Sequence, residues 1–415
     1  MKRLLIDLTD IKTWTGRFAG IQRVVYGVAK EFYLGGLGSD IQVKFIAFNN
    51  EGAYFYETTF ADIYEKVEKN VSVGKAEVKE LPIPEVRKYT IVKNRLKEYL
   101  SASSRESVST KNNDPEHFDF KAEDTVLILG MSWESNAMQV ELERIKNEQR
   151  IRVAQIVYDL IISLYPHLHH PDNFGPYTRN MEGVLKVSDQ LFPISTSTAS
   201  DIVRFAKNNQ KRTPRIDVIR LGDEIETLGS RKPDDRRIAN KFILCVGTIE
   251  IRKNHTLLYY AYKLASERGI KLPQLVIVGG SGWYTGDLQY TLANDKEIEK
   301  SIIIMKGIDD AELSWLYKNC LYTVYPSIYE GWGLPIAESL AYGKVCAASH
   351  SSSMTEIGGD LVKYYSPYST EELLSTMVAL VSDKKRSKLE QEIVTNYKKT
   401  KWHDTAGQIL EYLGK

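Results

Sequence analysis

In the second half of the chain, short apolar runs alternate with stretches in which apolar residues recur every three or four positions. The runs are rich in Val and Ile, and such continuous apolar runs are typical of strands buried on both faces of a parallel sheet. They lie at 242–247, 274–280, 301–307, 321–327 and 344–349. The stretches between them predict helices at 255–269, 310–320 and 335–343. This alternation predicts a doubly wound α/β domain.

The first half repeats the pattern less regularly. Apolar runs predict strands at 3–8, 42–48, 125–130, 152–160 and 190–195, and a helix is expected at 21–36. We therefore expect a second α/β domain. A segment at about 71–118, rich in Lys, Glu, Ser and Asn, is interpreted as an insertion in which 86–100 can form a basic amphipathic helix. We favour a solvated surface segment over contact with a membrane or an acceptor.

A chain of 415 residues exceeds what one hydrophobic core usually serves, so two domains are expected. The stretch 230–240 lacks apolar periodicity and is interpreted as the linker between them. We expect an N-terminal domain over 1–225, a C-terminal domain over 226–390, and a last helix over 391–415 that packs at the domain junction. The two domains are expected to face each other across a cleft.

Composition and charge narrow the functional classes. The net charge of +1 argues against nucleic acid as a partner. Asp7 interrupts the first apolar run after three residues, and no later run approaches the length of a membrane span, so we expect a cytoplasmic protein. The three cysteines are widely spaced in apolar runs and predict neither disulfides nor a zinc site. No Asp-x-Asp pair occurs, so no metal clamp and no cofactor are expected.

Two carboxylates flank the start of the helix predicted after 321–327. Glu330 lies on the preceding loop and Glu338 lies inside the helix, which begins near Pro335. Glycines in the loop allow close approach of a ligand, carboxylates accept hydrogen bonds from sugar hydroxyls, and a helix N-terminus favours phosphate. Spacing alone favours a plainer interpretation, in which one glutamate is a helix-surface acid and the other a loop residue.

The segment from Glu330 to Glu338, EGWGLPIAE, resembles the signature of glycosyltransferase family 4, which comprises retaining enzymes of the GT-B fold. That resemblance implies two Rossmann-like domains around a nucleotide-sugar site. It also implies that Glu330 orients hydroxyls of the donor sugar and that Glu338 binds the ribose. The intervening donor-binding positions are Gly331, Trp332, Gly333, Leu334 and Pro335.

Other segments resemble the donor-binding parts of that family in the same order along the chain. Segment 246–262 places Lys253 at the donor diphosphate, as a catalytic residue together with Glu330. Many members have an arginine where this chain has Thr248, a donor-binding position, and Arg252 is the candidate for the missing cation. Segment 305–320 places Gly307 and Ile308 at the nucleotide base.

In the N-terminal half, segment 15–32 resembles the family's glycine-containing loop, with Gly20 near the donor phosphate and Gln22 near the acceptor. The resemblance makes Asp159 and Ser195 further acceptor-side or catalytic candidates. Many relatives have a histidine where this chain has Tyr158. An isolated Asp at a strand end is more often structural than catalytic.

The resemblance implies metal-independent transfer of a hexose, with retention, from a nucleotide-diphosphate sugar to a hydroxyl of a lipid-linked or oligosaccharide acceptor. Bacterial surface-polysaccharide mannosyltransferases are the most similar members, so GDP-mannose is the favoured donor, with UDP-sugars and dTDP-rhamnose as alternatives. Lipopolysaccharide synthesis and peripheral association with the inner face of the membrane fit this interpretation. The competing hypotheses are an epimerase or phosphorylase of the same shape and a non-catalytic subunit that binds nucleotide sugars.

Overall fold

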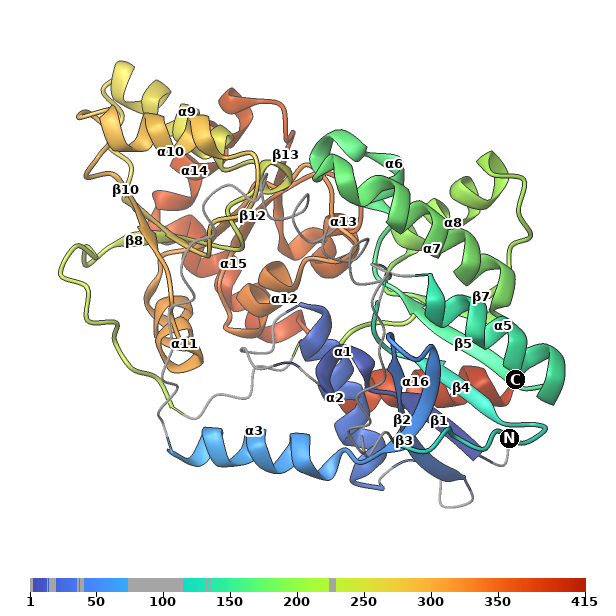
Figure 1. Ribbon diagram of the computed structural model, residues 1–415. Helices are drawn as coiled ribbons and strands as arrows, with labels where there is room; N and C mark the ends of the chain where they lie inside the picture. The colour runs from blue at the N-terminus through green and yellow to red at the C-terminus, as the bar shows by residue number, and fades with distance from the viewer. Residues whose placement is uncertain are drawn as a thin grey trace, which may run out of the picture.

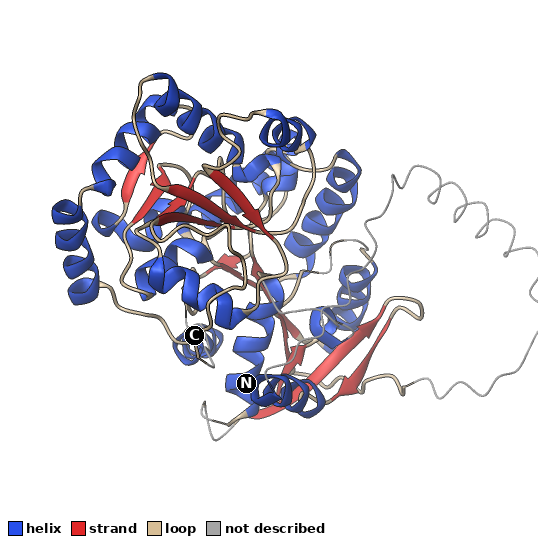
Figure 2. Ribbon diagram, turned by 90° about the vertical axis from the view of Figure 1, so that its left-hand side faces the viewer, coloured by secondary structure: helices blue, strands red, loops and turns tan. Residues whose placement is uncertain are grey.

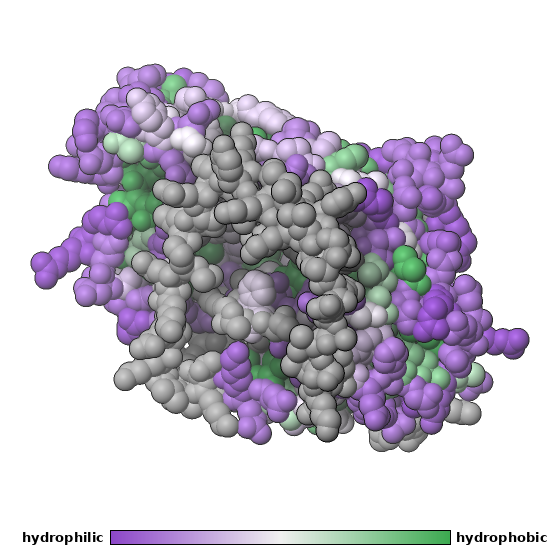
Figure 3. All heavy atoms as spheres, viewed as in Figure 1, coloured by the Kyte–Doolittle hydropathy of each residue, from purple (hydrophilic) through white to green (hydrophobic). Residues whose placement is uncertain are grey.

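The computed structural model describes residues 3–12, 14, 20–35, 37, 41–73, 115–131, 133, 136–223 and 229–415. These residues form two helix-flanked sheets in separate lobes (Figures 1 and 2). The insertion expected at about 71–118 falls mostly on 74–114, so the helix expected at 86–100 lies outside the described residues. No described helix is both long enough and apolar enough to cross a bilayer. The described surface visible in Figure 3 is mostly hydrophilic.

The first sheet has seven described strands in the order β3-β2-β1-β4-β5-β6-β7. They are β1 (Arg3–Asp7), β2 (Gln42–Asn49), β3 (Tyr54–Thr58), β4 (Thr125–Ile128), β5 (Arg152–Val157), β6 (Gln190–Pro193) and β7 (Arg215–Ile216). Only the pair of β2 and β3 is antiparallel in this described sheet. The sequence pattern predicted five of these strands and missed β3 and β7, since short edge strands need no long apolar run.

The described helices of this lobe are α1 (Thr9–Lys12), α2 (Ile21–Tyr33), α3 (Ala61–Val73), α5 (Ala137–Gln149), α6 (Ile161–Leu164), α7 (Phe174–Val187) and α8 (Thr196–Asn208). Helix α2 follows β1 and α1 in the chain and lies beside the strands of the first sheet (Figure 1). Its inward face is apolar, with Val24, Val25 and Val28 almost fully buried. That amphipathic pattern fixes which residues of its first turn face the second lobe.

The second sheet has six described strands, all parallel, in the order β10-β9-β8-β11-β12-β13. They are β8 (Phe242–Val246), β9 (Gln274–Val278), β10 (Ile302–Met305), β11 (Thr323–Tyr325), β12 (Cys346–Ser349) and β13 (Lys363–Tyr365). The chain moves outward in one direction from β8 and in the other direction from β11. The two central strands therefore form a topological switch point, where ligands bind in open α/β sheets.

The helices of the second lobe are α9 (His255–Glu267), α10 (Gly286–Asn294), α11 (Asp310–Asn319), α12 (Leu334–Ala341), α13 (Met354–Gly358), α14 (Thr370–Val381) and α15 (Asp383–Asn396). Helices predicted at 255–269, 310–320 and 335–343 correspond to α9, α11 and α12 within two residues at each end. One continuous cluster of buried apolar residues includes side chains of both sheets, among them Ile6 and Ile243. Shared packing therefore sets the position of one lobe on the other.

The end of the chain differs from the single helix expected over 391–415. Helix α15 ends at Asn396, and α16 (Trp402–Gly414) begins after a break. Asp223 stabilises this break, because its carboxylate accepts a hydrogen bond from the backbone N–H of Thr400 at 2.9 Å. Helix α16 then packs on α2 of the first lobe, and the Trp402 indole lies so close to Gly27 that a Cβ there would come within 2.4 Å of it.

Candidate active site

The carboxyl ends of β8 and β11 bring together the two segments that carry most of the predicted donor-binding residues. Residues 247–254 follow β8, and residues 326–333 follow β11. Because these two strands are paired and parallel, both segments leave the sheet at the same edge. That edge faces the first lobe, where Tyr158 O would lie 2.0 Å from a Cβ at position 331. The side chains at this edge therefore lie between the two lobes.

Glu330 is the centre of a buried polar cluster. One carboxylate oxygen accepts hydrogen bonds from Lys253 Nζ at 2.7 Å and from the Tyr325 hydroxyl at 3.0 Å. The other oxygen accepts one from Arg252 Nη1 at 2.5 Å. The backbone N–H of Glu330 also donates to Ser352 Oγ at 2.9 Å. The plainer interpretation of Glu330 as an ordinary loop residue does not fit a side chain that is 6% exposed.

The charges around Glu330 keep it ionised. Burial acts to raise the pKa of Glu330, but the positive charges of Arg252 and Lys253 outweigh it and lower that pKa to about 2. Burial in turn lowers the pKa of Lys253, although the carboxylate of Glu330 opposes this. At neutral pH Glu330 is therefore a hydrogen-bond acceptor only and carries no proton to transfer.

Arg252 and Lys253 form a short 3₁₀ turn immediately before α9, and both point at acidic side chains. Arg252 Nη2 donates to Glu250 Oε1 at 2.7 Å, and its Nη1 also reaches the backbone carbonyl of Tyr329 at 3.0 Å. Arg252, the predicted substitute for the cation missing at Thr248, is thus held by three acceptors, including Glu330. Thr248 itself is exposed at the end of β8.

Helix α12 begins as predicted from its residues. Gly333 has φ of +147°, which an L side chain rarely adopts, and Pro335 occupies the first turn. Three residues beyond it, Glu338 is buried, and its two oxygens accept from Tyr317 OH at 2.7 Å and from Arg23 Nη1 at 2.6 Å. The interpretation of Glu338 as an exposed helix-surface acid is wrong. Arg23 comes from α2, so this pair joins the two lobes.

The loop between the two glutamates packs against the first lobe. The hydroxyl of Tyr329 donates to Asp201 at 2.8 Å, and the hydroxyl of Thr198 donates to the backbone carbonyl of Gly331 at 3.3 Å. Trp332 is buried, with the Arg220 guanidinium 5.8 Å from the centre of its ring. The loop is therefore held from both lobes.

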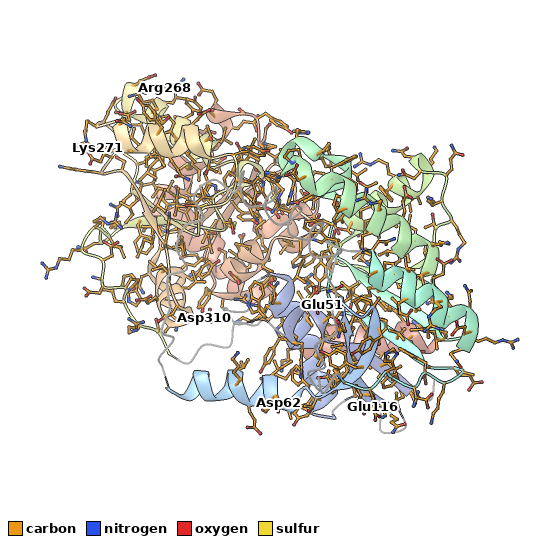
Figure 4. All side chains as sticks on the ribbon, viewed as in Figure 1. Glu51, Asp62, Glu116, Arg268, Lys271 and Asp310 are labelled. Atoms are coloured by element: carbon orange, nitrogen blue, oxygen red, sulfur yellow. The ribbon has the colours of Figure 1, made fainter. Side chains whose placement is uncertain are left out.

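The remaining donor-side candidates are Gly307 and Ile308 in the second lobe and Gly20 in the first lobe. Gly307, with φ of +67°, and Ile308 follow β10, two strands from β8. The next residue, Asp309, caps α11, whose start Figure 4 marks with the label of Asp310. Gly20 precedes α2 with φ of +53° and is exposed, and no atom of the described residues would lie within 4 Å of a Cβ at this position.

The acceptor-side candidates differ from one another in what they contact. Ser195 is almost fully buried and caps α8, accepting from the backbone N–H of Thr198 at 3.0 Å, which is a structural task. Asp159 lies beside the loop of Gly331, and burial raises its pKa while the charge of Arg252 opposes the rise. Gln22 lies half-buried in the first turn of α2.

Arg23 and Tyr317, the two partners of Glu338, were not among the predicted site residues, although they lie in the segments 15–32 and 305–320 that resemble the family. Tyr325 stands only five residues before Glu330, in the strand predicted at 321–327, and could have been suspected from that position. Among the described residues, no group of three or more His, Cys, Asp or Glu side chains could hold a metal ion.

The two Rossmann-like sheets facing each other, with acidic and basic side chains at their carboxyl edges, define the GT-B fold. The solved structure of Anabaena HepE in complex with UDP and glucose shares it, with a TM-score of 0.58 and 14% identity over 100% of both chains. Residues 230–400 match the family model described as Glycosyl transferases group 1. The chain thus has the GT-B fold, and its second lobe is similar to the glycosyl transferases of group 1.

Two curated relatives from Escherichia coli are mannosyltransferases by name. The serotype-specific mannosyltransferase WbdA is 26% identical over 266 residues, which is 62% of this chain and 32% of that protein. The O-antigen chain mannosyltransferase B is 27% identical over 217 residues, which is 50% of this chain and 56% of that protein. The matched regions thus span about a third and about half of the relatives' lengths. The resemblance to surface-polysaccharide mannosyltransferases is confirmed.

Proposed function

We propose that this chain is a retaining, metal-independent hexosyltransferase that moves mannose from GDP-mannose to a hydroxyl of a lipid-linked or growing bacterial surface glycan. The observation that carries the proposal is the pair of buried glutamates, Glu330 and Glu338, at the carboxyl edge of the second sheet. The relatives named as mannosyltransferases support the choice of sugar and of process. The choice of GDP as the nucleotide rests on that resemblance alone.

The charges assign distinct tasks to the two glutamates. Glu330, ionised because Arg252 and Lys253 lie against it, accepts hydrogen bonds from hydroxyls of the donor sugar. Glu338 accepts those of the ribose. Lys253, the N-terminus of α12 and the backbone at Gly20 stabilise the diphosphate as it departs.

Retention is part of the proposal and rests on the resemblance to the family. The Glu330 carboxylate is held on both oxygens by Arg252, Lys253 and Tyr325, which disfavours its attack on the anomeric carbon. The acceptor hydroxyl then attacks on the face that the diphosphate leaves, and the new glycosidic bond keeps the anomeric configuration. The acceptor proton passes to the departing phosphate oxygen, so no protein group is consumed.

A cavity of about 870 Å³ lies between α10 and the edge strand β10. Three of its lining residues, Ile249, Ser281 and Lys306, follow the carboxyl ends of β8, β9 and β10. Lys306 directly precedes Gly307, the position predicted for contact with the nucleotide base. The cavity offers room for a base at that end of the sheet.

The test separates the two glutamates by kinetics. First, GDP, UDP and dTDP are compared by thermal shift, since a ligand that binds only the native state raises its stability. With the donor so identified, E338Q is expected to raise KM for the donor, and E330Q is expected mainly to lower kcat. Wild-type kinetics in both variants would refute the assignment. Turnover of the donor without an acceptor would favour the epimerase hypothesis, and binding without transfer would favour the non-catalytic subunit.

A further inference from the structure

The charged cluster around Glu330 is already neutral before any donor arrives. Two cations, Arg252 and Lys253, face two carboxylates, Glu250 and Glu330, at 2.5 to 2.7 Å. Each of these cations already donates to at least two acceptors. A nucleoside diphosphate carries several negative charges, and the cluster offers it no net positive charge. Thr248 adds none.

Arg23 is a cation at the same site, and among the described residues its side chain pairs with Glu338. It is the third residue of α2, and its guanidinium crosses from the first lobe to Glu338 in α12, where Nη1 lies 2.6 Å from Oε1. Its side chain is 20% exposed, against 6% for Glu338. The second partner of Glu338, Tyr317, is fully buried on the same lobe. Of these two partners, Arg23 is the one that can leave without disturbing the core.

A ribose bound at Glu338 would compete with Arg23 for the same carboxylate oxygen. A ribose hydroxyl that donates to Oε1 must share or replace the bond from Arg23. A partly buried guanidinium without a counterion is unfavourable, so the displaced side chain needs a new anion. The donor brings one, because the diphosphate is joined to the same ribose through its 5′ oxygen. The planar guanidinium suits phosphate oxygens, which it can contact with two parallel hydrogen bonds.

We propose that Arg23 is a donor-binding residue that exchanges partners: it neutralises Glu338 in the empty enzyme and turns to the diphosphate when the ribose takes that carboxylate. The inference rests on the proposed function, since it takes Glu338 as the ribose-binding group. Arg23 would be the second cation at the diphosphate, in place of the arginine that many family members have where this chain has Thr248. Arg252 does not fill that role, because Glu250 and Glu330 already hold it. The exchange by Arg23 also makes the first lobe a part of the donor site.

The experiment compares ligands that differ only in phosphate. Binding of guanosine and GDP, and of uridine and UDP, is measured by isothermal titration calorimetry with wild type, R23Q and R23K. In R23Q the diphosphate should bind about tenfold more weakly. The nucleoside should bind as tightly as to wild type or more tightly, since it no longer competes with an ion pair. R23K, which keeps the charge, should recover part of the diphosphate affinity.

Two control variants make each outcome decisive. E338Q should weaken nucleoside and diphosphate alike; if it weakens neither, the ribose assignment of the proposed function fails, whatever R23Q does. E356Q weakens a different contact between the lobes, in which Glu356 accepts hydrogen bonds from the backbone N–H groups of Thr196 and Ser197. It should change the affinities for nucleoside and diphosphate by the same factor. Suppose that E338Q lowers the affinity for both ligands, while R23Q either leaves both affinities unchanged or changes them by the same factor. The exchange of partners by Arg23 is then wrong, and the proposed function stands. Thermal melts verify that the variants fold.

Discussion

Removing the charge of Glu330 should destabilise the protein even without substrate. E330Q keeps the shape of the side chain but leaves the partly buried Arg252 and Lys253 beside a neutral amide. The two cations lower the pKa of Glu330 from its ordinary 4.5 to about 2. At about 1.4 kcal/mol for each pH unit, a difference of about 2.5 corresponds to about 3 kcal/mol of folding free energy. Loss of one partner of a buried ion pair typically costs about 3–5 kcal/mol, which agrees.

The stabilisation by the Glu330 carboxylate should depend on pH. Because the folded-state pKa is lower than the unfolded one, the stabilisation is present above about pH 4.5 and is lost as the pH falls towards about 2. Urea unfolding at pH 7 should therefore show E330Q less stable than wild type by about 3 kcal/mol, with a smaller difference near pH 3. The matched control is E371Q, which breaks the exposed pair of Glu371 with Arg268 and should change the stability little, because solvent screens that pair. An E330Q variant no less stable than E371Q at pH 7 would refute the reasoning.

Three further predictions concern other parts of the fold. Burial raises the pKa of Asp7 to about 7, so its ionisation opposes folding increasingly as the pH rises from about 4 to 7. At pH 8, D7N should therefore unfold at a higher urea concentration than wild type, and this difference should shrink towards pH 4. W402A should lower stability by about 3–5 kcal/mol, because its indole fills the space over Gly27; a T400A control that is equally destabilised would argue against packing as the cause. S195A should cost about 1 kcal/mol in unfolding experiments through loss of the α8 cap, and S195T, which keeps the hydroxyl, should restore it.

The local pattern of the sequence was sufficient for the elements that build the two sheets. Continuous apolar runs located the strands of the second sheet from β8 to β12, because strands buried on both faces admit few polar residues. Pro335 located the start of α12, since its backbone preference acts without tertiary contacts. Edge strands β3, β7 and β13 escaped prediction. The helix expected over 391–415 proved to be two, and Asp223, from elsewhere in the fold, accepts a hydrogen bond from the backbone of the break between them.

For the site, the sequence by itself determined which residues carry charge near the carboxyl ends of β8 and β11. It could not determine their partners, since hydrogen bonds between segments far apart in the chain depend on how the sheets pack. Only the tertiary structure placed Arg252 against Glu330 and Glu250, where it is held, and brought Arg23 across from the first lobe to Glu338, 315 positions along the chain. The periodicity of a segment reports which of its faces is buried, and not which distant side chain lies against that face.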